Sequence, residues 1–187
     1  MFPVKLFRLA LVGIDSLRGK EIKSVFEQKR FPLASMEFYN PDVGEEFSKL
    51  TEFRDEPKVV HHLDEKYLEG LDLVYLATDK DISKKLGQLA RKGKFRAIDL
   101  SEAFNHDPSV PLIVGGINDN ELKGTRTNLV ANPHPATIFL SHLIKVILKE
   151  NRIKQIVSFV LQPASAFDES GIEELADQSV ATLSSSS

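Results

Sequence analysis

The sequence predicts an α/β protein with a mostly parallel sheet and helices on both of its faces. Short apolar runs alternate with stretches of helical periodicity as far as Ala131, an order typical of parallel strands joined by right-handed crossovers. Hydrophobic residues make up 42% of the 187, which is enough apolar material for a packed core. After residue 132 the elements become longer, which predicts the beginning of a second domain.

The first predicted elements follow one another in a regular order. Residues 7–13 form an apolar run of the kind found in buried parallel strands, and residues 18–29 repeat apolar side chains at helical spacing. A second strand over residues 36–39 is stopped by an Asn-Pro-Asp turn. The charged stretch 42–57 predicts a loop, and residues 59–63 predict a short strand.

Four further strands and one helix complete the predicted sheet. Residues 71–78 are strongly apolar and lead into a helix over residues 82–92. The remaining strand predictions are shorter and cover residues 95–100, 112–114 and 128–131. The sheet therefore has strands and helices in alternation, as parallel topology requires.

The C-terminal part of the chain shows a different pattern. It predicts a long helix over residues 136–149, a long strand over residues 153–161 and an amphipathic helix over residues 171–183. One strand and two helices cannot close a sheet core, so we expect the rest of this domain beyond Ser187 or in a partner. The predicted domains are residues 1–132 and 133–187.

The bulk composition excludes several function classes. The net charge of −3 gives no overall attraction to nucleic acid or to an anionic membrane, and no apolar run is long enough for a membrane span. The chain has no cysteine, which excludes disulfides, thiolate metal ligands and a cysteine nucleophile within it. His61 and His62 are adjacent and would point to opposite faces of a strand, so we expect no metal site. These features predict a cytoplasmic protein.

A glycine-containing turn after the first strand predicts a dinucleotide site of the Rossmann-like kind. Gly13 and Gly19 take the outer positions of the phosphate loop, and Ser16 stands where a middle glycine lets phosphate approach the backbone. Asp15 would repel a pyrophosphate, while Asp42 could accept a hydrogen bond from a ribose hydroxyl. A turn retained only for folding is the alternative. The candidate residues for binding NAD or NADP are Gly13, Ser16, Leu17 and Gly19.

Four ordered stretches of the chain carry a family resemblance. They read LALVGIDSLRGKEI, AIDLSEAFNHDPSVPLIVGGIN, LVANPHPATIF and IVSFVLQPASAFDESGIEELADQSVATL. Together they resemble the aspartate-semialdehyde dehydrogenase family. The resemblance implies an NAD(P)-binding Rossmann-like domain followed by the beginning of an α+β dimerisation domain. In that family a cysteine thiolate attacks the aldehyde, hydride passes to NADP, and phosphate resolves the thioester.

The resemblance places Pro135 at the nucleophile position, and proline has no side-chain heteroatom. Beside it His134 replaces an asparagine, whereas Asn132 and Gln162 match the family and are the candidate substrate-binding residues. Imidazole can act as a base or a nucleophile, but His134 is held between two prolines. We therefore assign no catalytic residue.

The anion-binding residues of the family are also replaced. Asn105 stands where an arginine would grip phosphate, and Glu102 adds a negative charge nearby. Residues 40–44 contain no arginine for the 2′-phosphate of NADP.

These substitutions predict an inactive homologue with a binding or regulatory role, as a homodimer or a hetero-oligomer with a related dehydrogenase. The alternatives are an active NAD(P)-dependent semialdehyde dehydrogenase of amino-acid biosynthesis with an altered substrate or nucleophile, and a fragment without independent function.

Overall fold

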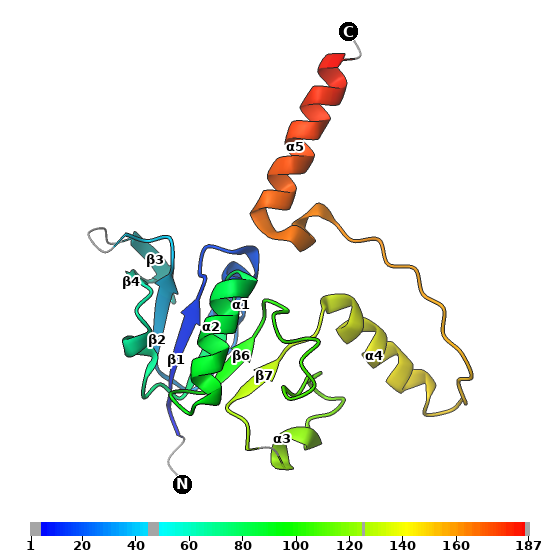
Figure 1. Cartoon of the computed structure of the whole chain (residues 1–187), viewed down its shortest axis with the longest axis horizontal. Coiled ribbons are helices and arrows are strands. Elements are labelled where there is room, and N and C mark those ends of the chain that lie inside the picture. The colour runs from blue at the N-terminus through cyan, green and yellow to red at the C-terminus, as the bar shows by residue number, and fades with distance from the viewer. Residues whose placement is uncertain (1–4, 45–48, 125, 186–187) are drawn as a thin grey trace.

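A seven-stranded sheet forms the centre of the molecule (Figure 1). The computed structural model describes residues 5–44, 49–124 and 126–185. The strand order is β3-β4-β2-β1-β5-β6-β7, and every neighbouring pair is parallel except β3 with β4. The strands are β1 (Phe7–Val12), β2 (Leu33–Asn40), β3 (Lys49–Phe53), β4 (Glu56–His62), β5 (Leu73–Leu76), β6 (Ala97–Asp99) and β7 (Leu129–Ala131). The predicted fold class is therefore confirmed.

Strand β1 lies at the centre because both of its faces are apolar. Leu9 and Leu11 pack into one core cluster, and Ala10 and Val12 pack into another on the opposite face. Burying one leucine-sized side chain contributes roughly 1.5–3 kcal/mol. The strand pairs with β2 on one side and with β5 on the other, so the chain order reverses here. Such a reversal opens a crevice at the carboxyl ends of the strands.

One long helix covers each face of the sheet. Phe26 of helix α1 (Leu17–Gln28) packs into the cluster around Leu9 and Leu11. Leu86 and Ala90 of helix α2 (Lys80–Arg91) pack into the cluster around Ala10 and Val12. The prediction of helices on both faces is confirmed.

The loop predicted over residues 42–57 is wrong, because part of it forms a β-hairpin. Strands β3 and β4 pair with Phe53 opposite Glu56, leaving a two-residue turn at Arg54 and Asp55. Both turn residues have positive φ, 53° and 62°, as tight hairpin turns require. Such turns usually carry Asn-Gly or Asp-Gly, and Arg-Asp gives no such signal.

Two other predicted strands do not form, although the structure describes both stretches. Residues 112–114 make one isolated bridge, between Leu112 and Ala131. Residues 153–161 form no strand, and Figure 1 shows them in an extended stretch away from the sheet. A strand needs a hydrogen-bonded neighbour, and this stretch has none among the described residues. Its Phe159 and Leu161 are 94% and 96% exposed.

The C-terminal helices agree with the prediction. Helix α4 (Pro135–Ile147) follows β7, and helix α5 (Asp168–Ser185) projects away from the sheet (Figure 1). Short helices complete the described elements: η1 (Glu65–Leu68), α3 (Asn120–Gly124) and η2 (Ala164–Phe167). Within the described residues, no helix combines the length and the apolarity needed to span a bilayer. The division at residues 132 and 133 stays a prediction.

Gly13 and Gly19 approach so closely that a side chain at residue 19 has no room. A Cβ on Gly19 would lie 2.0 Å from the carbonyl oxygen of Gly13, so alanine must push helix α1 away from strand β1. We expect Gly19→Ala to destabilise the protein by about 3 kcal/mol, although alanine favours an isolated helix. Urea unfolding followed by circular dichroism measures this change.

The matched control is Gly115→Ala, because a Cβ there meets nothing within 4 Å. We expect its unfolding midpoint to stay close to that of the wild type. Equal stability of the two variants would contradict the packing described for helix α1.

Candidate functional site

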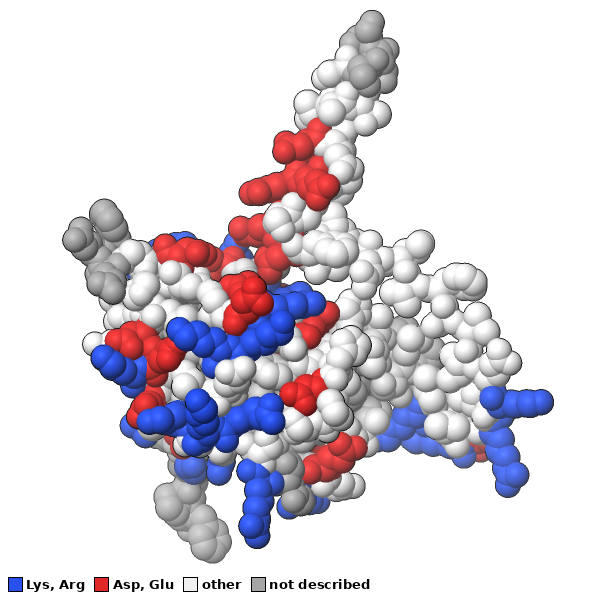
Figure 2. Space-filling view, in the orientation of Figure 1, with Lys and Arg blue, Asp and Glu red and all other residues white. Residues whose placement is uncertain are grey.

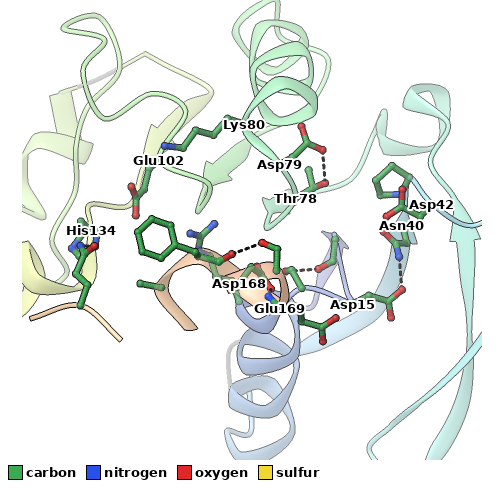
Figure 3. A pocket seen from close by; sticks show the side chains of 18 residues that line it. Asp15, Asn40, Asp42, Thr78, Asp79, Lys80, Glu102, His134, Asp168 and Glu169 are labelled. Carbon is green, nitrogen blue, oxygen red and sulfur yellow. Dashed lines mark hydrogen bonds between the residues drawn. The ribbon is translucent and has the colours of Figure 1, made fainter. Parts of the chain in front are cut away.

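A cavity of about 620 Å³ lies at the carboxyl ends of β1, β2 and β5, where the chain order reverses (Figure 3). Its walls come from several parts of the chain that are distant in sequence. They include the turn after β1, the end of β2, the start of α2 and the segment that leads into α5. Ligands of parallel α/β sheets bind in this position.

The predicted phosphate-loop residues do come together at the start of helix α1. Gly13 has a φ of 87°, a left-handed conformation that favours glycine, and its N–H donates to the Tyr39 carbonyl at 2.8 Å. Ser16 is the N-cap of the helix, and its Oγ accepts from the Gly19 N–H at 2.9 Å. Leu17 is the first helical residue.

The Ser16 side chain is already occupied by the fold. Its hydroxyl proton can go to either of two carbonyl oxygens, that of Ala77 at 2.6 Å or that of Gly13 at 2.8 Å. Its N–H also donates to the Gly13 carbonyl, at 3.2 Å. Neither donor of Ser16 is therefore free for a phosphate in this conformation. Cofactor binding by the loop stays a prediction.

Asp15, which we expected to repel a pyrophosphate, has partners of its own. Its carboxylate accepts from the Asn40 side-chain amide (Figure 3) and forms an ion pair with Lys49 at 2.7 Å. The charge is thus partly balanced on the β2 side of the cavity. Asp42 also lines the cavity, at the place predicted for a ribose contact.

An acidic contact at the start of helix α1 was not predicted from the sequence. The Leu17 N–H donates to the Asp168 carboxylate at 2.9 Å, and the neighbouring Glu169 pairs with Lys20. The hydrogen bond from Lys20 to Glu169 raises the pKa of the lysine ammonium above its ordinary value. Nothing in the sequence pattern indicates that these residues meet.

Residues at the end of β5 were also missed. Thr78, Asp79 and Lys80 line the cavity immediately after that strand. The rule that ligands bind at the carboxyl ends of parallel strands would have indicated them.

The cavity is predominantly acidic. Two of its described lining residues carry a permanent positive charge, Arg18 and Lys80, and the Lys80 side chain reaches toward Glu102 in Figure 3. Figure 2 shows further acidic side chains on the part of α5 nearest the sheet. The carboxylates among the lining residues are Asp15, Asp42, Asp79, Glu102, Asp168 and Glu169.

The predicted substrate-binding residues, Asn132 and Gln162, lie near the N-terminus of helix α4. His134 is its N-cap and Pro135 its first residue. The Gln162 amide nitrogen lies 2.7 Å from His134 Nε2, and Gln162 lines the first cavity. Asn132 lines a second cavity of about 610 Å³ together with Leu17 and Pro135. The structure therefore brings His134 and Gln162 into contact and places Asn132 next to Pro135.

Both ring nitrogens of His134 have partners. Nδ1 accepts from the Ala136 N–H at 3.1 Å, as an N-cap does, so this nitrogen carries no proton. Nε2 must then carry the proton of the neutral ring. It can donate to Gln162 once the side-chain amide is turned to present its oxygen, an assignment made from the hydrogen-bond network.

The loop after β6 is fixed by one buried carboxylate. Asp99 accepts from the Ser101 hydroxyl at 2.6 Å and from the Phe104 N–H at 3.2 Å. This loop holds Glu102 in the wall of both cavities with a φ of 66°. Asn105, where the resemblance implies an arginine, lines neither of them, and its side-chain oxygen is buried without a hydrogen-bond partner among the described residues.

Metal binding finds no support in the described part of the chain, where no group of three or more histidine, cysteine or acidic side chains is arranged to hold an ion. His61 and His62 instead line a separate cavity beside Tyr39.

Curated and solved relatives agree with this architecture. An aspartate-semialdehyde dehydrogenase of Aquifex aeolicus is 28% identical over 177 residues, covering 94% of this chain and 52% of that protein. The chain thus spans about half the length of the curated relatives it matches. Aspartate semialdehyde dehydrogenase II from Vibrio cholerae, complexed with ASA, has the same fold, with a TM-score of 0.84 and 23% identity over 97% of this chain and 54% of that one.

A more distant structural match is aspartate semialdehyde dehydrogenase with NADP from Candida albicans. Its TM-score is 0.53 and its identity 13%, covering 78% of this chain and 48% of that one. The family model for the NAD-binding domain of semialdehyde dehydrogenase matches residues 8–125, which is more than half of the chain. The chain therefore belongs to the semialdehyde dehydrogenase family through its NAD-binding domain.

Proposed function

We propose that this chain is a catalytically inactive member of the family, with a binding or regulatory role. The observation that carries the proposal is Pro135 at the first position of helix α4, where the resemblance places the thiolate. Formation and displacement of an acyl intermediate need a polarisable nucleophile. Proline offers none, and the chain contains no cysteine.

The contacts of His134 support the same conclusion. A base needs a free lone pair directed at its substrate, but the lone pair of Nδ1 accepts from the Ala136 N–H. The Nε2 side is bonded to Gln162. Glu102 further adds negative charge to the cavity wall that a phosphate would have to approach.

The proposal includes weak binding of NAD or NADP. Family membership and the cavity at the carboxyl end of β1 support a dinucleotide site. The first turn of helix α1 would hold the pyrophosphate through backbone N–H groups and the helix dipole. The many carboxylates of the cavity and the occupied donors of Ser16 weaken that site.

The proposed role also includes a partner, either a second copy of this chain or a related dehydrogenase. Apolar side chains that a packed domain would bury are exposed here, among them Val157, Phe159 and Leu161 in the extended stretch after α4. A strand-like stretch of this kind gains hydrogen bonds and apolar contacts when it joins a sheet.

The activity assay is the direct test of the proposed function. We expect no reduction of NADP with aspartate semialdehyde and phosphate, because Pro135 has no nucleophilic atom and both ring nitrogens of His134 are hydrogen-bonded. Absorbance of NADPH at a range of protein concentrations measures this. Turnover that disappears in His134→Ala would contradict the proposal and support the alternative of an altered nucleophile.

A second test asks whether the helix end that would present a nucleophile still stabilises an anion. A lone cysteine in Pro135→Cys would sit at the first position of helix α4, where the dipole lowers the thiol pKa. If that pKa falls by about one unit, alkylation at neutral pH should be about threefold faster than for an ordinary thiol. The pH dependence of the iodoacetamide reaction measures both quantities.

The matched control is Ser179→Cys, an exposed position in the interior of helix α5. It introduces the same single thiol without a helix N-terminus. Identical pH profiles for the two cysteines would contradict the view that Pro135 occupies a former nucleophile position.

A further inference from the structure

The first turn of helix α1 has backbone N–H groups that the helix itself cannot satisfy. The Gly19 N–H donates to the cap Ser16, and the Leu17 N–H donates to Asp168. The Arg18 N–H has no hydrogen-bond partner among the described residues. Leu17 and Arg18 therefore carry the two N–H groups that a pyrophosphate would use at this helix.

Asp168 reaches this position from 151 residues further along the chain. The same carboxylate oxygen accepts from the Leu17 N–H and from the Glu169 N–H, each at 2.9 Å. It thus joins the first turn of α1 to the first turn of α5. The adjacent ion pair between Lys20 and Glu169 connects the same two helices.

The backbone of Asp168 is strained in this arrangement. Its φ is 65° and its ψ is −156°, a region that is almost confined to glycine and costs of order 1–3 kcal/mol for other residues. Such a conformation persists only when other contacts compensate for it. The charge-assisted hydrogen bond to Leu17 is one such contact.

We propose that Asp168 is an autoinhibitory stand-in for a phosphate, so that its carboxylate and a dinucleotide compete for the same N–H of helix α1. The inference rests on the proposed dinucleotide site. One N–H cannot serve both anions, and a phosphate beside a carboxylate is opposed by like charge. Dinucleotide binding therefore requires the residues around Asp168 to leave the first turn of α1.

Titration of NADH and NADPH by fluorescence, with the whole chain, tests this competition. Asp168→Gly removes the carboxylate and suits the observed φ and ψ. We expect it to bind at least one of the two dinucleotides about tenfold more tightly than the wild type. Asp168→Asn keeps an acceptor but loses the charge, and should give a gain of about threefold.

Glu173→Gln is the matched control, because it removes one exposed carboxylate from the same helix, outside the cavity lining, without freeing the Leu17 N–H. Its affinity should stay within about twofold of the wild type. A gain in dinucleotide affinity as large as that of Asp168→Gly would overturn the inference. The loss of one negative charge, wherever it lies, would then explain both gains.

The remaining outcomes separate the inference from the proposed function. Equal affinity of the wild type, Asp168→Gly and Asp168→Asn would overturn the inference and leave the dinucleotide site intact. Absence of binding by every variant at millimolar dinucleotide would overturn both. Hydrogen exchange at Leu17 gives an independent readout, and its amide should exchange faster in Asp168→Gly than in Glu173→Gln.

Discussion

The attachment of helix α1 to the end of strand β1 is the constraint on which the site depends. Gly19 packs against the Gly13 carbonyl with no room for a side chain, and the Ser16 hydroxyl joins the turn to the Ala77 carbonyl. These contacts direct the first turn of α1 into the crevice beside β1. The same geometry that binds phosphate in dinucleotide folds here receives the carboxylate of Asp168.

Two helix N-termini thus meet the two cavities, and polar groups at each are already hydrogen-bonded within the fold. At α1 both donors of Ser16 bond to carbonyl oxygens of the fold, and the Leu17 N–H donates to the Asp168 carboxylate. At α4 the first residue is Pro135, and the cap His134 is bound on both sides of its ring. A scaffold can persist after its reactive groups are lost, because its stability comes from buried side chains elsewhere.

Much of the fold could be predicted because it depends on local pattern. The apolar run of β1 and the periodicity of α1 and α2 are sufficient signals. The hairpin at Arg54 and Asp55 lacks the usual turn residues, and residues 153–161 have strand composition but no neighbouring strand among the described residues. The sequence was enough to locate the phosphate-loop residues and Pro135 at their helix N-termini. The contact between Asp168 and Leu17 depends on packing between distant segments, which local pattern does not reveal.

In the proposed function, the chain keeps a nucleotide-binding scaffold without the nucleophile of its family. Intact-protein mass spectrometry tests it most directly, after incubation with aspartate semialdehyde and NADP in phosphate-free buffer. An active member would accumulate an acyl adduct under these conditions, because no phosphate is present to release it. We expect no NADP-dependent change in mass, and an NADP-dependent acyl adduct on His134 or any other residue would contradict the proposed function.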